Sequence, residues 1–116
     1  MLKSTIKLTG KLVIKKLNES NEVVYQTEVD NLVVTSGKEF VASRIANNDY
    51  SVMGYMAIGD DASSASASQT TLVNELARVA VNSKTASGVN STFVATFPAG
   101  TGTGDIVEAS IVNASS

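Results

Sequence analysis

Two neighbouring runs of alternating residues near the start of the chain limit its fold more than any other feature. In residues 4–17, apolar side chains occupy most even positions, and Lys or Thr fills most positions between them; residues 22–29 alternate again. A period of two places one set of side chains on a buried face of a strand and the other set in water. The polar residues 18–21 between the runs tolerate tight backbone angles. The pattern predicts an antiparallel β-hairpin over residues 4–29.

The remaining apolar runs are short and predict further strands at residues 32–34, 52–58, 77–81, 92–97 and 106–112. The run 52–58 is apolar on both faces of a strand, which predicts a strand that is covered on both sides, by the fold or by another subunit. The segments between the runs predict a mobile surface loop at the Ser/Ala-rich residues 62–68 and further loops at 85–91 and 99–104.

Two short helices are predicted among these strands. Ser36 and Glu39 have the spacing of a capping box, in which each side chain bonds a free backbone N–H at a helix start. Val41 and Ile45 lie four residues apart, so a helix is expected over residues 37–47. Leu72 and Leu76 lie four residues apart and predict a second helix over residues 71–76.

Short links between strands favour antiparallel pairing over crossover connections. We therefore expect a mainly β fold, a small antiparallel β-sandwich or open barrel with one or two short helices, the first of which closes one end. A chain of 116 residues is enough for one domain and not for two, so residues 1–116 are predicted to form a single domain.

The side chains that the sequence lacks argue against several functions. Without Cys or His there is no disulfide, no thiolate and no imidazole base. The net charge of −2 argues against binding to a phosphate backbone, which needs a dense Lys/Arg surface. Residues 1–5 do not begin a signal peptide, and no run is long enough for a transmembrane helix. We expect no catalytic activity, no cofactor, no nucleic-acid or membrane partner, and synthesis in the cytoplasm.

Two segments superficially suggest a ligand site. Asp49, Asp60 and Asp61 could supply oxygen ligands for a weakly bound cation, but their spacing is not that of an EF-hand loop, and Asp is common in turns. The segment Gly100–Gly104 is similar to a phosphate-binding loop, but a strand is predicted after it where such loops have a helix. A turn and a flexible hairpin loop are the favoured interpretations.

Charged residues on the later strands suggest pairs. Asp105 and Glu108 differ in parity and therefore point to opposite faces of a strand, so Glu108 is predicted to lie at a solvated edge and not in a catalytic carboxylate pair. Glu75 and Arg78 are three residues apart at the end of the second predicted helix. They are expected to pair with each other, and Arg78 could alternatively bridge to a neighbouring subunit.

Basic residues gather near the N-terminus, at Lys3, Lys7, Lys11, Lys15 and Lys16. Lysines along a strand protect a sheet edge from aggregation, which is the favoured interpretation. A positive stripe of this kind could also meet an acidic partner surface.

The middle of the sequence resembles a family of phage proteins. Residues 55–61 read Tyr-Met-Ala-Ile-Gly-Asp-Asp, a loop of small residues follows, and residues 68–78 read Ser-Gln-Thr-Thr-Leu-Val-Asn-Glu-Leu-Ala-Arg. This order is similar to the N-terminal domain of tailed-phage tail-collar fibre proteins. Residues 31–37 are similar to the strand-to-helix segment of that family, and residues 105–113 are similar to a strand of related short virion proteins. The shared pattern covers residues 31–113, so the hairpin 4–29 lies outside it, and the long fibre shaft is missing.

The resemblance implies a non-enzymatic virion protein that is made in the host bacterial cytoplasm and forms a homo-oligomer, a trimer or hexamer. The favoured function is a small capsid decoration or head-surface protein that binds the major capsid protein. A neck, tail or baseplate component, or the base of a tail fibre, is the alternative that the fibre motifs favour. The candidate subunit contacts are Lys7, Lys11, Tyr55, Glu75, Arg78 and Ile111.

Two functions of other classes stay open. A small β fold could be a carbohydrate-binding attachment module, for which Tyr25, Tyr50 and Tyr55 would be the residues to stack on sugar, since the chain has no Trp. A hydrolase is the least favoured, because the carboxylates do not converge in the predicted topology.

Overall fold

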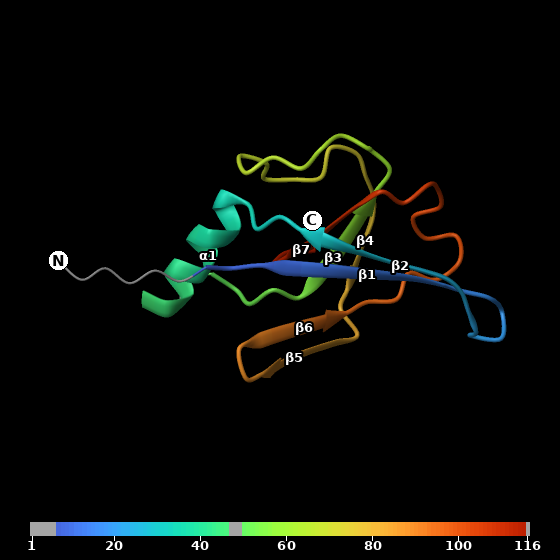
Figure 1. Cartoon of the computed structure of the whole chain (residues 1–116), viewed down its shortest axis with the longest axis horizontal. Helices are drawn as coiled ribbons and strands as arrows, with labels where there is room; N and C mark the ends of the chain where they lie inside the picture. Colours follow the sequence, from blue (N-terminus) through green and yellow to red (C-terminus); the bar gives the residue numbers. More distant parts are fainter. Residues whose placement is uncertain (1–6, 47–49, 116) are drawn as a thin grey trace.

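The computed structural model describes residues 7–46 and 50–115. The elements in chain order are β1 (Gly10–Leu17), β2 (Val23–Asn31), α1 (Thr35–Ala46), β3 (Tyr55–Gly59), β4 (Glu75–Ala80), β5 (Ser83–Ser87), β6 (Asn90–Val94) and β7 (Glu108–Val112). They form three small antiparallel sheets: the hairpin β1–β2, the three-stranded sheet β4–β3–β7 and the hairpin β5–β6 (Figure 1). The predicted mainly β, antiparallel fold is confirmed, with one short helix and no closed barrel in the described part of the chain.

The first hairpin forms as the alternation predicts, and its turn explains why. The side-chain oxygen of Asn18 accepts the backbone N–H groups of Ser20 and Glu22 at 2.9 and 3.0 Å. Asn21 adopts a positive φ of 61°, a conformation that Asn tolerates better than most residues. Residues 7–9 precede β1 and are not part of the strand, and residues 4–6 lie outside the described residues.

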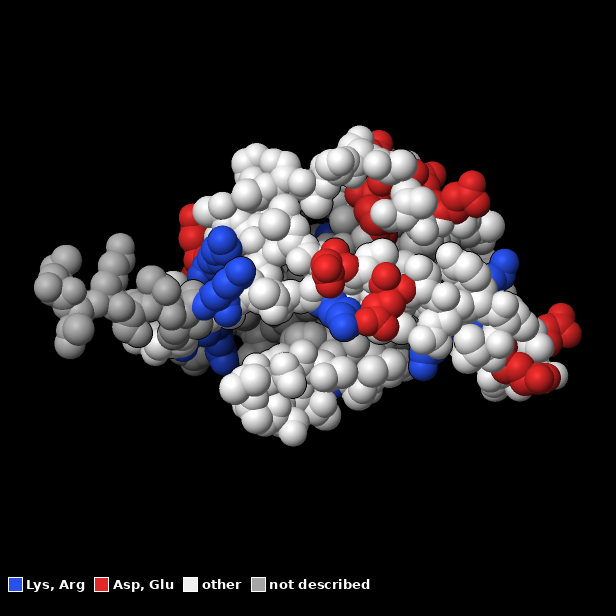
Figure 2. All heavy atoms as spheres, in the orientation of Figure 1, with Lys and Arg blue, Asp and Glu red and all other residues white. Residues whose placement is uncertain are grey.

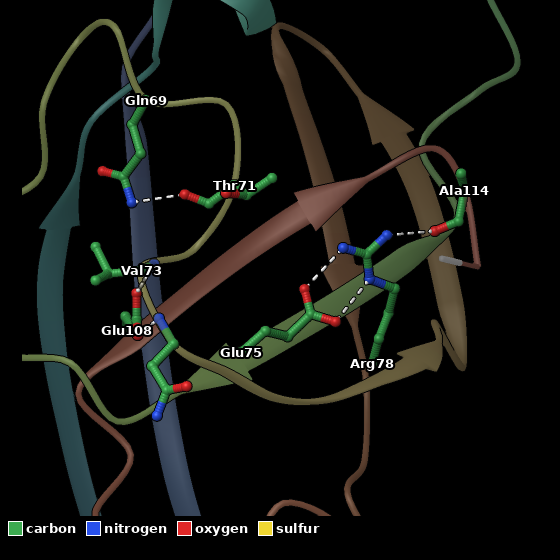
Figure 3. Close-up of polar contacts among 8 residues, drawn as sticks. Gln69, Thr71, Val73, Glu75, Arg78, Glu108 and Ala114 are labelled. Carbon is green, nitrogen blue, oxygen red and sulfur yellow. Dashed lines mark hydrogen bonds and ion pairs between the residues drawn. The ribbon is translucent and has the colours of Figure 1, made fainter.

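The three-stranded sheet has one apolar face and one mixed face. Its register places six apolar residues on the same face: Met56, Ile58, Ala77, Val79, Ala109 and Ile111. The hairpin β1–β2 crosses in front of this sheet in Figure 1 and behind it in Figure 3, where Glu75 and Arg78 project toward the viewer. The hairpin therefore lies over the apolar face, and the charged residues of β4 occupy the opposite face.

The interior is small for a chain of this length. Among the described residues only Ala57, Ile58 and Gly59 are buried. The chain exposes 8699 Å², whereas a compact monomer of 12.0 kDa exposes roughly 6,000 Å². Large apolar side chains are exposed on the hairpin β1–β2, on α1 and at the tip of β5–β6, where Val89 is fully exposed.

Several predicted elements are wrong in whole or in part. The strand predicted at 92–97 is β6, which ends at Val94, and the strand predicted at 106–112 is β7, which begins at Glu108. Residues 32–34 are not a strand and lead directly into α1. The strand predicted at 52–58 begins only at Tyr55, and Val52 is 48% exposed. The helix predicted at 71–76 does not form: residues 71–74 are irregular, and Leu76 belongs to β4.

The polar segment 85–91, predicted to be a loop, is instead most of the hairpin β5–β6, which turns at Gly88 with φ 58°. Both strands are largely exposed, so they carry no alternating apolar pattern. The first helix forms, but it begins at Thr35, so Ser36 lies inside its first turn and not at the capping position before it. With no barrel to close, α1 lies at one end of the molecule (Figure 1).

The loop 62–68 is exposed, as predicted, but it is also attached to the fold. The carbonyl of Ala67 accepts the backbone N–H of Thr35 at the start of α1, at 2.8 Å. Gln69 accepts the N–H of Ser66 and donates to the carbonyl of Thr71 at 2.8 Å (Figure 3). The loop therefore fixes the start of the helix and is not simply mobile.

Candidate subunit interface

The six candidate contact residues lie on different parts of the molecule. Lys7 is exposed just before β1. Lys11 lies on the outer face of the hairpin, where its Nζ is 2.8 Å from a carboxylate oxygen of Glu28 on β2. The hydrogen bond and charge of Glu28 raise the pKa of Lys11. The side chain of Lys11 is 61% exposed and that of Glu28 is 50% exposed. This pair is a solvated contact of the sheet surface.

Tyr55 and Ile111 lie within the three-stranded sheet, and both are half-buried. Tyr55 pairs with Ala80 on one side and Val112 on the other, and it lines a cavity of about 540 Å³. Ile111 pairs with Met56 on the apolar face beneath the first hairpin. Neither residue joins the surface formed by Lys7 and Lys11.

Glu75 and Arg78 form the predicted pair, but on a strand and not on a helix. The guanidinium donates to both carboxylate oxygens of Glu75, at 2.7 and 3.2 Å, and its third nitrogen donates to the carbonyl of Ala114 at 3.0 Å (Figure 3). The side chain of Arg78 is only 16% exposed. Within one chain Arg78 therefore attaches β4 to the segment after β7.

Glu108 is the most constrained carboxylate, and its predicted position at a solvated edge is right in part: β7 is an edge strand of its sheet, but the carboxylate is engaged by the protein. It is half-buried at the start of β7, and its oxygens accept three backbone N–H groups: Val73 at 2.8 Å, and Asp61 and Asn74 at 2.9 Å. Figure 3 shows Val73 beside Glu108. Desolvation by burial, the largest single effect, raises the pKa of Glu108, but the three N–H groups together outweigh it and hold the pKa below its ordinary value. The ionised form is therefore the one that the fold favours.

A glycine makes this arrangement possible. A Cβ on Gly59 would collide with the carbonyl oxygen of Asn74 and with the carboxylate of Glu108. The carbonyl of Asn74 also accepts the N–H of Asp60 at 3.3 Å, and the side-chain amide of Asn74 donates to the carboxylate of Asp60. We call this group the Glu108 clasp; its members are Gly59, Asp60, Asp61, Val73, Asn74 and Glu108.

The clasp joins segments that are far apart in the sequence. Its members come from residues 59–61, 73–74 and 108, which lie within three of the four stretches that suggested the resemblance in the sequence. Spacing alone could not predict it, because the partners of Glu108 are 34 to 47 residues away. The sequence feature that indicated these segments is the order of the motifs. In the structure, the motifs meet in a contact that holds the fold together.

The aspartates of the predicted turn are engaged by neighbouring donors. Asp60 accepts from Asn74, and Asp61 accepts the N–H of Ser63 at 2.8 Å. The Ser63 side chain, and to a smaller extent this N–H, lower the pKa of Asp61. Within residues 7–46 and 50–115, no three acidic side chains gather in a way that could hold a metal ion. Asp49 lies outside the described residues, so its part in a cation site has no structural account.

The segment 100–104 is not a free loop. A Cβ on Gly102, which has φ 72°, would lie 2.8 Å from Cδ1 of Ile58 and 3.0 Å from Cβ of Ala77. The loop therefore packs onto the apolar face of the sheet and helps to bury Ile58, in place of the flexible hairpin loop that the sequence predicted.

An apolar groove that the sequence did not predict lies between α1 and the hairpin β5–β6. Its volume is about 510 Å³, and we call it the α1 groove. The apolar residues that line it are Phe40, Val41, Ile45, Val52, Met53, Ala86 and Phe93. Ile45 is 75% exposed and Val52 is 48% exposed. The four-residue spacing of Val41 and Ile45 was a usable signal, but nothing in the sequence indicated that β5–β6 lies opposite them.

Comparisons with family models, with curated proteins and with solved structures give no match to this chain. In the described residues, no helix is long and apolar enough to cross a membrane. The function therefore has to be inferred from the surfaces of the molecule and from the sequence motifs.

Proposed function

We propose that this chain is a non-enzymatic structural subunit of a tailed-phage virion, placed at the head surface, where it binds copies of itself and the major capsid protein. The observation that carries the proposal is the apolar surface that a single chain leaves uncovered. The total exposed area, polar and apolar atoms together, exceeds that of a compact monomer by roughly 2,700 Å², and the exposed apolar side chains on β1–β2, on α1 and at the tip of β5–β6 are part of it. Each partner of a standard-size interface buries about 800 Å², so packing in an assembly would account for part of this excess.

The use of the charged residues also supports a structural role. Glu108 has its oxygens engaged by three backbone N–H groups, and Arg78 is engaged by Glu75 and Ala114. These contacts hold irregular segments onto the three-stranded sheet. These hydrogen bonds make the subunit rigid, as a subunit of a shell needs to be.

A position at the neck, tail or baseplate is the second candidate. The observation that favours it is the Glu108 clasp, because the motifs that resemble tail-collar fibre proteins meet there. A fibre base would use the same rigid sheet and would differ in location and copy number.

The test is the composition of the particle. Virions of the phage that encodes the chain are purified, and each protein is quantified by mass spectrometry relative to the major capsid protein. We expect the chain at a fixed ratio close to that of the capsid subunits, with labelled antibodies on the heads. Label on the tail with few copies would overturn the head placement in favour of the second candidate, and a chain absent from washed particles would overturn both.

A further inference from the structure

We propose that the α1 groove binds the turn of the β1–β2 hairpin, residues 17–24, of a second copy of this chain, so that copies associate head to tail. The inference rests on the proposed function as an assembling subunit and names the surfaces through which it assembles. The two surfaces are different, and they lie at opposite ends of the molecule (Figure 1).

The α1 groove has the properties of an unfilled interface. Its walls are α1, which has no buried residue, and β5–β6, which is exposed along nearly its whole length. An isolated two-stranded hairpin is only marginally stable in water, so β5–β6 gains most from a partner that packs against it. Phe40, Ile45 and Phe93 supply the apolar surface for that contact.

The hairpin turn has the matching apolar content. Leu17 is 46% exposed, Val23 is 51% exposed and Val24 is 58% exposed, although the turn beside them is ordered by the Asn18 side chain. An element whose conformation is already fixed loses little entropy when it binds. The turn is therefore a preformed apolar ridge that has no cover in its own chain.

The charges of the two surfaces are complementary. The charged residues that line the α1 groove are Arg44 and Lys84, and no acidic residue lines it. Residues 17–24 contain Glu19 and Glu22 and no basic residue. In Figure 2, blue side chains gather at the end that holds α1, with a red one beside them, and red side chains gather at the far end of the hairpin, with blue ones nearby. Such complementarity fixes the orientation of two partners more than it adds affinity.

Head-to-tail contacts have a specific consequence. Each copy offers one turn and one groove, so the contact is heterologous and either closes into a ring or continues as a filament. A dimer in which two grooves meet would leave both turns unused, and a dimer in which two turns meet would leave both grooves unused.

The test removes one surface at a time. Ile45→Asp disables the groove, and Val24→Asp disables the turn; both residues are more than half exposed, so both variants should keep the wild-type circular dichroism. Each variant alone should be monomeric by light scattering, with concentration taken from refractive index because the chain has no Trp. Mixed one to one, the variants should form a dimer and nothing larger, because a single intact turn meets a single intact groove.

Charge variants test the same contact without adding a charge to an apolar surface. Lys84→Glu or Glu22→Lys should each weaken association at least about tenfold, and the chain with both changes should recover most of the loss. Val107→Asp, at a 52% exposed residue outside both surfaces, is the matched control and should keep the wild-type mass.

The inference is overturned if Ile45→Asp or Val24→Asp keeps the wild-type mass, if the mixture stays monomeric, if Val107→Asp is also monomeric, or if the wild-type chain never associates. These outcomes leave the particle composition untouched. A chain that is present in virions but assembles through other residues would therefore refute the groove and not the proposed function.

Discussion

Two regions of the molecule, the Glu108 clasp and the α1 groove, differ in how they use their side chains. At the Glu108 clasp, three backbone N–H groups converge on one carboxylate, and Gly59 is there because nothing larger fits. At the α1 groove, Ile45 and Val52 are largely exposed. The clasp is complete within a single chain, and the groove leaves apolar side chains exposed. Substitutions at the first should therefore change folding, and substitutions at the second should change association.

The largest difference is expected between two substitutions to Asp. Ile58→Asp places an unpaired charge on the covered face of the sheet and should destabilise the chain by about 4 kcal/mol or more, which prevents soluble folding. Val52→Asp should fold, because Val52 is 48% exposed at the groove. Expression in the soluble fraction and far-UV circular dichroism measure both. A soluble Ile58→Asp with wild-type melting would show that this sheet is not the core.

The next effect tests the close approach at Gly59. Gly59→Ala forces apart the Asn74 carbonyl and Glu108, and it should cost about 3 kcal/mol, measured by urea unfolding. The matched control is Gly37→Ala in α1, where the added Cβ would lie 3.6 Å from Val33 and helix propensity favours Ala by about 0.5–1 kcal/mol. Equal costs for the two substitutions would contradict the clasp geometry.

Acid should loosen the clasp before it affects the groove. Because the fold lowers the pKa of Glu108, its contribution to the unfolding free energy is complete above about pH 4.3, the ordinary glutamate pKa, and is lost as pH falls through the folded-state value. Glu108→Gln keeps the shape of the side chain, but its NH₂ group faces a backbone N–H that has lost its acceptor. The substitution should lower the free energy of unfolding by about 2 kcal/mol at neutral pH.

The pH profile separates this site from other carboxylates. Between pH 5 and pH 3, Glu108→Gln should lose less stability than the wild-type chain. Glu28→Gln, which breaks an exposed ion pair with Lys11, is the control and should melt as the wild type does at neutral pH. Parallel profiles for wild type and Glu108→Gln would exclude Glu108 as the acid-sensitive group.

The smallest effect concerns the loop of residues 62–68. Removal of Ser64 and Ala65 should change stability by less than about 0.5 kcal/mol, because short changes in surface loops are tolerated. Removal of residues 63–67 also takes away the carbonyl of Ala67 that accepts the Thr35 N–H, and should cost about 1 kcal/mol more. Thermal melting of the two deletions compares them, and identical melting would mean that this bond does not hold α1.

Local patterns predicted the parts of the fold that local contacts determine. The hairpin β1–β2 follows from period-two alternation around a turn whose Asn18 bonds its own neighbours, and α1 follows from apolar residues four apart. Leu72 and Leu76 show the limit of the same rule. Their spacing suits a helix, but the N–H groups of Val73 and Asn74 bond Glu108, a partner 34 and more residues away.

The hairpin β5–β6, the partners of Glu108 and the α1 groove could not be predicted from local patterns in the sequence. Strand β5 and the first residues of β6 are exposed on both faces, so they carry no alternation, and their polar sequence is typical of a loop; only residues 92–94 of β6 belong to a run that predicted a strand. Glu108 was placed in solvent by parity alone, because a single sequence does not reveal that two loops bring three donors to it. The α1 groove depends on where β5–β6 sits relative to Ile45, which is also a tertiary property.

The central strand β3 has a consequence for synthesis on the ribosome. Both of its neighbours follow it in the chain, and β7 begins 49 residues after the end of β3. Contacts this distant form late, so a nascent chain that stops before residue 108 has an apolar strand without its second neighbour and without the Glu108 carboxylate. Translation that ends early would thus yield a product prone to proteolysis, and only chains that reach residue 112 can complete the sheet.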